Sequence, residues 1–503
     1  MAKKIFLFTI VLFGAFLITN QASAQSRQRL SMDLGWKFKL GDPHGAEKTS
    51  YNDRNWRKLD LPHDWSIEGK YSKDAPGGGS FGYLPAGIGW YRKQFVIPGK
   101  LLNEEVKIRF DGVYRDSDVW INGHHLGNHP YGYTPFVYDL NPFLKKGKNI
   151  IAVRVNNSEQ PNTRWYSGSG IYRNVWMIIT GHLHIARYGV YVTTPIAKAD
   201  SGLVNVQTKI RNDYPDVQKA RLTSFLLDAQ GREVAKVTKD FEVNGKASIT
   251  LTQQMKVNNP HLWSLESPYL YSIRTIISVG NKELDKKETP FGIREIRYYT
   301  NKGFYLDGEH VKMKGVCLHE NGGAVGAAVP PGVWERRLKE LKKMGVNAIR
   351  TAHNPPAPAF LNLCDRLGLL VMDESFDIWT VGKRKYGYQQ YFDKWATIDL
   401  STMLLRDRDH PSVVLWSIGN EIPEQSMDKG AAIAKKLVDI CHRLDPTRPV
   451  TSACDKIADD SNPTKLAFLK QLDIVGYNYV DRWHRRRELF YTPDKIKFPN
   501  RQM

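Results

Sequence analysis

Cysteine is scarce in this sequence, with four residues among 503. The four, Cys317, Cys364, Cys441 and Cys454, lie in the C-terminal part of the chain and follow no metal-ligand spacing. A small disulfide-stapled fold is therefore excluded, and so is a cysteine-type zinc site. Because a large domain with a core of its own needs no covalent staples, we expect buried free thiols at all four positions.

Long apolar runs are missing except near the N-terminus. There Lys3 and Lys4 precede an apolar run over residues 5–18, and Ala22-Ser23-Ala24 follows it. This order is typical of a signal peptide that is cleaved after residue 24. The run is shorter than the 18 or so apolar residues that a spanning helix needs. We expect a periplasmic or secreted protein with no stable membrane insertion after cleavage.

The sequence also lacks a concentrated basic region, although its net charge is +20. Lysine and arginine are scattered along the chain, and no nucleic-acid-binding motif accompanies them, so we expect no nucleic-acid partner. The one dense cluster comprises Arg482, Arg485, Arg486 and Arg487. It indicates a solvated helix face or, alternatively, a site for an acidic substrate group.

What the sequence does contain, over about residues 30–290, is short alternating strands separated by turn signals. This spacing predicts antiparallel β-sandwiches. Asn122-Gly123 follows Val119-Trp120-Ile121 and predicts a tight hairpin, since both turn positions tolerate positive φ. A break near Gly181 separates a stretch long enough for a jelly roll from one with the length of an immunoglobulin-like module.

After about Phe291, strands alternate with helical periodicity, which predicts parallel βα units. One helix is expected where Trp334, Leu338, Leu341 and Met344 recur at helical spacing. Six units are visible where a (β/α)₈ TIM barrel needs eight, so we expect an incomplete barrel. The six strands are expected at residues 311–319, 346–351, 368–374, 412–420, 449–453 and 472–479.

Polar residues end five of these six strands. In such barrels the carboxyl ends of the strands line the active site, and buried polar groups cost free energy unless they are paired. The set therefore predicts one functional pocket. Its members are His319, Glu320, Arg350, His353, Asp373, Glu374, Asn420, Glu421, Tyr477, Asn478 and Tyr479.

The fourth strand carries the most specific signal. Its apolar residues 413–418 lead through Gly419 to an amide and an acid, Asn420-Glu421. A carboxyl beside apolar walls has a raised pKa and can protonate a glycosidic oxygen. The adjacent amide can bind a sugar hydroxyl.

At this point the sequence resembles glycoside hydrolase family 2, the group of β-galactosidases, β-glucuronidases and β-mannosidases. Residues 406–411 resemble the start of the family's acid/base signature, and residues 347–355 its other signature. Residues 120–123 and 168–175 resemble the family's first domain. The resemblance implies three domains after the signal peptide (1–24): a sugar-binding-type jelly roll (27–181), an immunoglobulin-like sandwich (182–292) and a catalytic TIM barrel (293–503).

The resemblance also implies roles for single residues. Glu421 would be the general acid/base, and Asn420 would bind the sugar 2-hydroxyl. His319 and His353 fall where the family has sugar-contacting histidines, although both could instead be satisfied structural histidines. Arg350 would steady the nucleophile, and Tyr479 would hydrogen-bond to it.

Two features depart from the family pattern. Where its metal-dependent members hold magnesium, this chain has Ile378 and Thr380; neither suits a hard cation, so we expect no metal and no cofactor. Retaining hydrolysis also needs a second carboxylate about 5–5.5 Å from the first, which the family supplies from strand seven. Because the sequence ends at Met503, we expect no nucleophile in this chain, with Glu320, Glu374 and Glu488 poor substitutes.

We therefore interpret the sequence as a fragment of an exported retaining β-glycosidase of β-galactosidase type. It would release terminal β-D-galactosyl residues from oligosaccharides or polysaccharides, and the fragment alone would be inactive. A β-glucuronidase of the same family is the alternative within the enzyme class. A non-catalytic carbohydrate-binding protein is the alternative outside it. A homo-oligomer stays compatible with the sequence.

Overall fold

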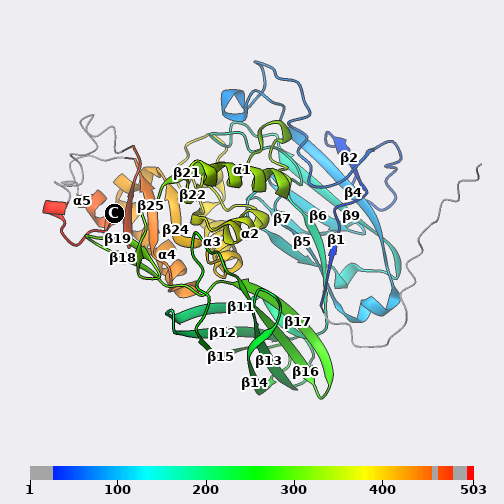
Figure 1. Cartoon of the computed structure of the whole chain (residues 1–503). Helices are drawn as coiled ribbons and strands as arrows, with labels where there is room; N and C mark the ends of the chain where they lie inside the picture. Colours follow the sequence, from blue (N-terminus) through cyan, green and yellow to red (C-terminus); the bar gives the residue numbers. More distant parts are fainter. Residues whose placement is uncertain (1–26, 456–462, 480–494, 503) are drawn as a thin grey trace, which may run out of the picture.

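The computed structural model describes residues 27–455, 463–479 and 495–502. The predicted signal peptide and the arginine cluster at 482–487 lie outside these residues. Figure 1 shows a β-sandwich from the N-terminal part, a second β-sandwich beside it, and a parallel sheet with helices from the C-terminal part. No helix in the described segments is long and apolar enough to cross a bilayer.

The first sandwich packs a four-stranded sheet, order β1-β10-β5-β8, against a six-stranded sheet, order β3-β2-β4-β9-β6-β7. Alternating residues of both sheets point inward, as in β5, where Val106, Ile108 and Phe110 are fully buried. The strands are β1 (Gln28–Ser31), β2 (Trp36–Leu40), β3 (Arg57–Leu59), β4 (Gly87–Ile97), β5 (Glu105–Phe110), β6 (Ser117–Ile121), β7 (His124–His129), β8 (Phe136–Asp139), β9 (Gly147–Asn157) and β10 (Val175–Thr180).

The predicted hairpin at Asn122-Gly123 is confirmed. Ile121 of β6 pairs with His124 of β7, so two residues make the turn. Asn122 has φ +51° and Gly123 φ +86°, which is the pair of left-handed conformations that a tight hairpin turn requires.

The second sandwich packs β11-β12-β15 against β14-β13-β16-β17, and all its strand pairs are antiparallel. Its core is aliphatic, with Leu222, Ile273 and Ile277 fully buried. The strands are β11 (Leu183–Ala197), β12 (Ser201–Asn212), β13 (Gln218–Leu227), β14 (Glu233–Val243), β15 (Ser248–Asn258), β16 (Tyr271–Val279) and β17 (Lys282–Phe291).

The C-terminal part is an incomplete TIM barrel, as predicted. Six parallel strands run in the order β21-β22-β23-β24-β25-β26, preceded by a small antiparallel sheet of β18 (Ile296–Tyr299), β19 (Gly303–Leu306) and β20 (Glu309–His310). The parallel strands are β21 (Gly315–Leu318), β22 (Ala348–Thr351), β23 (Leu370–Glu374), β24 (Val413–Asn420), β25 (Val450–Cys454) and β26 (Ile474–Tyr477). The helices are α1 (Pro331–Lys343), α2 (Pro358–Leu367), α3 (Phe392–Asp407), α4 (Asp428–Leu444) and α5 (Pro463–Leu469).

Two expectations about single residues were wrong. Met344 lies just past the end of α1 and is 78% exposed, because the helix ends one residue before the apolar periodicity does. Cys317 is exposed, since β21 is an edge strand of the sheet, whereas the other three cysteines are buried. All four are free thiols, as predicted.

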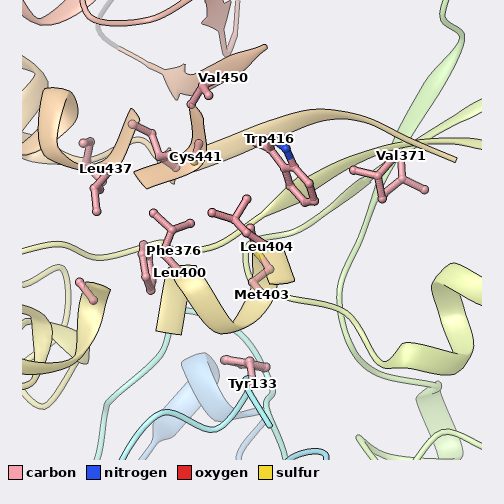
Figure 2. Close-up of a cluster of buried hydrophobic side chains, with 14 of the residues drawn as sticks. Tyr133, Val371, Phe376, Leu400, Met403, Leu404, Trp416, Leu437, Cys441 and Val450 are labelled. Atoms are coloured by element: carbon pink, nitrogen blue, oxygen red, sulfur yellow. The ribbon is translucent and has the colours of Figure 1, made fainter. Parts of the chain in front are cut away.

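The first sandwich and the barrel share one hydrophobic core. Figure 2 shows Tyr133, from the loop between β7 and β8, in the same cluster as Phe376, Leu400 and Trp416 of the barrel. Polar contacts reinforce this interface. The buried Arg173 guanidinium lies 3.1 Å from Glu320 and donates to the Pro355 carbonyl at 2.9 Å. This interface fixes the first sandwich against the carboxyl end of the barrel strands.

Candidate active site

A polar network joins the carboxyl ends of β22, β23 and β24 with the residue that follows β26. Arg350 donates to the Asn420 side-chain carbonyl at 2.7 Å and to that of Asn478 at 3.2 Å. Asn478 in turn donates to Asn420 at 3.2 Å and to Glu421 Oε1 at 2.9 Å. The structure thus brings Arg350, Asn420 and Glu421 together, as the strand pattern predicted.

Glu374 is the fully buried anchor of this network. Its carboxylate accepts two hydrogen bonds from Arg350 Nη2, at 3.0 and 2.9 Å, one from His353 Nδ1 at 2.6 Å and one from Ser417 at 2.6 Å. Burial alone would raise the pKa of Glu374, but the Arg350 charge and the bond from His353 outweigh it and lower the pKa. Glu374 is therefore an ionised group that orients Arg350 and His353.

Glu421 is held differently, at the mouth of the site. Its backbone φ is +48°, and 10% of its side chain is exposed. Its closest cation is Arg164, whose Nη1 lies 3.4 Å from Oε2. The pKa of Glu421 is lowered, because hydrogen bonds from Tyr479 and Asn478 and the charges of Arg164 and Lys383 outweigh the effect of burial.

This result corrects the sequence prediction of a raised pKa for Glu421. The prediction assumed apolar walls, but the apolar residues of β24 precede Glu421 and lie in the core. The surroundings of the carboxylate itself are amide, phenol and cationic groups, from Asn478, Tyr479, Arg164 and Lys383, and all four lie outside β24.

Asp377 forms a second ionised centre beside Glu421, and the sequence reasoning missed it. It accepts hydrogen bonds from Arg164 at 2.6 and 3.0 Å, from Lys383 at 2.8 Å and from the Asn420 amide at 2.8 Å. Although burial opposes ionisation, the bond from Arg164 and the Lys383 charge lower the pKa of Asp377 to about 2. Asn420 is fully buried and bonded on both sides, so its amide orientation is fixed.

Two histidines and a tryptophan form the adjoining wall. The Trp165 ring lies 4.7 Å from the His319 ring and 5.4 Å from the His353 ring, between centroids. Burial and the neighbouring His353 lower the pKa of His319 to about 4, so its imidazole is neutral at pH 7. Among the described residues, His319 Nδ1 is buried and has no hydrogen-bond partner.

Arg164 and Trp165 belong to the first sandwich, in the loop after β9. They reach the barrel site because the loop lies in the interface described above. Periodicity carries no signal for them, since they lie in an irregular loop. The one available hint was their position, with Tyr166 and Ser167 between, before Gly168-Ser169-Gly170-Ile171, which belongs to the segment that resembles the family's first domain.

Three of the predicted strand-end residues lie outside the network. Asp373 points into the core, where burial and Asp407 raise its pKa. Glu320 is paired with Arg173 in the domain interface. The Tyr477 hydroxyl accepts a hydrogen bond from Arg501 at 3.0 Å.

A small aromatic pocket of about 50 Å³ adjoins His353 and Asp377. It is formed where the first sandwich meets the barrel, so aromatic residues of both contribute. Those residues are Tyr114, Tyr131, Tyr133, Trp165, Phe376, Tyr388 and Tyr391.

The positions compared with a magnesium site have other functions. Ile378 is buried and lines the aromatic pocket, and the Thr380 hydroxyl donates to Glu424 at 2.7 Å. Within the described segments, no group of three or more His, Cys, Asp or Glu residues could hold a metal ion.

Comparisons with known proteins match this architecture. Models for "Glycosyl hydrolases family 2" match residues 82–181 (sugar binding domain), 183–294 and 298–488 (TIM barrel domain). "Beta-galactosidase BoGH2A" of Bacteroides ovatus is 42% identical over 92% of this chain and 58% of its own length. A beta-glucuronidase of Bacteroides fragilis is 29% identical over 91% of this chain and 64% of its own length.

A solved structure agrees closely as well. The crystal structure of a glycosyl hydrolase family 2 member from Bacteroides cellulosilyticus superposes with a TM-score of 0.90 at 40% identity, over 94% of this chain and 60% of its own. The chain thus spans about 60% of the length of these relatives. With three matched domains in the family order, the chain belongs to glycosyl hydrolase family 2.

Proposed function

We propose that this chain forms the acid/base and sugar-binding part of a retaining β-glycosidase of β-galactosidase type, with Glu421 as the general acid/base. The observation that carries this proposal is a contrast among the carboxylates at this end of the barrel. Glu374 and Asp377 are locked in ion pairs of 2.9 and 2.6 Å. Glu421 keeps solvent access and a cation no closer than 3.4 Å. It is the carboxyl that can exchange a proton with a substrate.

The lowered pKa of Glu421 suits the base half of this role. The acid half needs a protonated carboxyl, and two effects would supply it when a substrate is bound. A sugar in front of Glu421 excludes water, which favours the neutral form, and a second carboxylate nearby raises the pKa by like-charge repulsion. Retaining enzymes place such a carboxylate about 5–5.5 Å away.

We further propose that the nucleophile is not among the described carboxylates. Asp377 shares Arg164 with Glu421, but four hydrogen bonds and a pKa of about 2 make it a poor nucleophile. Glu374 and Glu320 are bound to Arg350 and Arg173. Glu488 lies outside the described residues.

The proposed binding roles follow from position. We place the neutral imidazole of His319 against a sugar hydroxyl, with His353 beside it in an orientation that Glu374 fixes. Arg350 and Asn420 both form hydrogen bonds with Asn478, which also bonds to Glu421. Asn420 would bind the sugar 2-hydroxyl, and Arg350 and Tyr479 would hydrogen-bond to the nucleophile. In this structure Tyr479 forms a hydrogen bond with Glu421 instead.

The test is turnover of aryl β-D-galactosides by the protein with whatever residues its gene encodes beyond Met503. Glu421→Gln should lower kcat for 4-nitrophenyl β-D-galactoside by about 10²–10⁴-fold. It should lower kcat/KM much less for the 2,4-dinitrophenyl galactoside, because kcat/KM reports formation of the glycosyl-enzyme and this leaving group needs no protonation. Azide should restore turnover with a β-galactosyl azide product.

Glu424→Gln is the matched control, because Glu424 is a fully buried glutamate of the same segment that does not face the site. Its kcat should stay near that of the wild type. Equal loss of kcat/KM with both aryl galactosides, or no loss in Glu421→Gln, would remove Glu421 from the acid/base role. Saturable galactoside binding without turnover in the wild type would favour a carbohydrate-binding protein instead.

A β-glucuronidase is the second candidate. Arg164 and Lys383 place two cations next to Glu421, and these cations could attract the carboxylate of a uronate sugar. The Bacteroides fragilis relative named beta-glucuronidase also aligns over 91% of this chain. Comparing kcat/KM for aryl β-D-galactoside, β-D-glucuronide and β-D-mannoside decides between the candidates. A larger value for the glucuronide would overturn the galactosidase assignment.

Export by residues 1–24 is part of the proposal. Its support is the sequence pattern alone. N-terminal sequencing of the protein recovered from the periplasm or medium should begin at Gln25, and a mature protein that still begins at Met1 would refute it.

A further inference from the structure

A cavity of about 180 Å³ lies at the junction of the two sandwiches, away from the barrel site. One wall is the outer face of the four-stranded sheet of the first sandwich, from β5, β8 and β10. The other wall comes from the first half of β11 and from β17. Figure 1 shows β11 and β17 at the border of the second sandwich that faces the rest of the molecule.

The lining of this cavity is strongly cationic. Among its twelve described lining residues there are five arginines or lysines and one histidine, and no aspartate or glutamate. These six are Arg27, Lys107, Arg109, Arg187, Lys287 and His184. A seventh basic side chain, Arg29, lies close enough for the Arg109 charge to contribute, after burial, to lowering its pKa. So many like charges around one void repel each other unless an anion is near.

Lys287 is the most informative member of the set. Burial lowers its pKa to about 8, although the charges of Asp409 and Asp285 oppose the shift. Among the described residues, the Lys287 ammonium has no hydrogen bond and no ion pair. Its neighbours Lys286 and Glu288, by contrast, face outward and form ion pairs with Glu283 and Arg274. A desolvated ammonium without a hydrogen-bond acceptor is costly. Lys287 is therefore a candidate for binding an anion in this cavity.

The nearby acids lie outside the cavity lining, and each already has a partner of its own. Asp409, whose charge acts on Lys287, accepts a hydrogen bond from the Val192 backbone at 2.9 Å. Asp285 accepts hydrogen bonds from Arg27 at 3.1 and 2.9 Å and from the Ile185 backbone at 2.7 Å. Asp111 lies 2.9 Å from Arg109 and accepts a hydrogen bond from Trp176 at 2.7 Å. Lys107 lies 3.6 Å from Glu105. Among the described residues, Lys287 and Arg187 form no ion pair with a carboxylate.

We propose that this cavity binds a tetrahedral oxyanion, phosphate or sulfate, either as the free ion or as an ester on a glycan. Its volume is well above the roughly 10–15 Å³ that a single water needs, and arginine and lysine are the donors that such anions take. The bound anion would link β5 of the first sandwich to β17 of the second, so it would stabilise their junction. The site is independent of the glycosidase proposal.

The experiment is isothermal titration of sodium sulfate into the full 503-residue chain at pH 7, with sodium chloride at equal ionic strength as the reference. We expect one saturable sulfate site. Lys287→Met should weaken sulfate binding at least about tenfold, which corresponds to the loss of one charge-assisted hydrogen bond. Lys286→Met, one residue away on the outward face of β17, should bind like the wild type.

Lys107→Gln on the opposite wall gives a second variant should Lys287→Met fold poorly, and it should also weaken binding. Titrating galactose 6-sulfate next to inorganic sulfate separates the two sources, since the tighter ligand identifies the class. No saturable heat beyond the chloride reference would overturn the proposal. So would equal sulfate affinity in Lys287→Met and Lys286→Met.

Discussion

Glu374 and Glu424 allow a sharp test of how this half-barrel holds its buried charges. Both glutamates are fully buried, but their partners differ. Glu374 accepts hydrogen bonds from the Arg350 guanidinium, from His353 and from Ser417, which occupy both of its oxygens. Glu424 accepts three bonds from neutral donors of Thr380 and Val381, all on Oε1.

Glu374→Gln should destabilise the barrel by about 3–5 kcal/mol, because it leaves the Arg350 charge buried without its counter-ion and turns an amide NH₂ toward other donors. Glu424→Gln should cost less than about 1 kcal/mol. Its amide oxygen can keep all three bonds, and the NH₂ replaces Oε2, which has no partner among the described residues.

Urea denaturation followed by tryptophan fluorescence measures both effects, since Trp379 and Trp416 are fully buried in the barrel. With a slope of about 2 kcal/mol per M, Glu374→Gln should lower the barrel midpoint by about 1.5–2.5 M. Glu424→Gln should leave it within about 0.5 M. Equal midpoints for the two variants would refute the reasoning that the cationic partner sets the cost.

Three further predictions follow from the site and the core. Replacing Arg164 by Met removes a cation that lowers the pKa of Glu421, so the basic limb of the kcat/KM pH profile should move to higher pH; an unchanged limb would contradict this. His319 has a folded pKa of about 4 against about 6.5 when unfolded, so the unfolded state takes up a proton first and stability should fall by up to about 3 kcal/mol as pH drops from 6.5 to 4. His319→Gln should flatten that part of a stability–pH curve, and an identical slope would count against it. Finally, Ellman's reagent should label Cys317 in the folded 503-residue chain, and the buried Cys364, Cys441 and Cys454 only after unfolding; rapid labelling of all four would contradict the structure.

The barrel was predictable because its signals are local. Apolar strands that end in polar residues place Arg350, Glu374 and Asn420-Glu421 at one edge, since the carboxyl ends of parallel strands meet there. Two other features follow from short-range rules of the same kind. Helix α2 ends at Leu367, with Gly368 in a left-handed conformation, and Asn122-Gly123 forms a tight hairpin turn.

The rest of the site depends on contacts between distant segments. Arg164 lies 213 positions before Asp377, and no pattern within either segment predicts that they meet. The pKa of Glu421 was mispredicted for the same reason, since Arg164, Lys383, Asn478 and Tyr479 all approach it from outside β24. Exposure of Cys317 likewise depends on β21 being a sheet edge, which is a property of the assembled sheet.

The loop that carries Arg164 and Trp165 has a consequence for the inheritance of this fold. A barrel excised by recombination would keep Glu421 and Lys383 but lose Arg164, the cation 3.4 Å from Glu421, and the Trp165 ring beside the histidines. The site is therefore kept intact only when the barrel is inherited together with the first sandwich, which Arg173 anchors to it. Substitutions on the sandwich side of this interface should change the reactivity of Glu421, although no residue of the barrel is replaced.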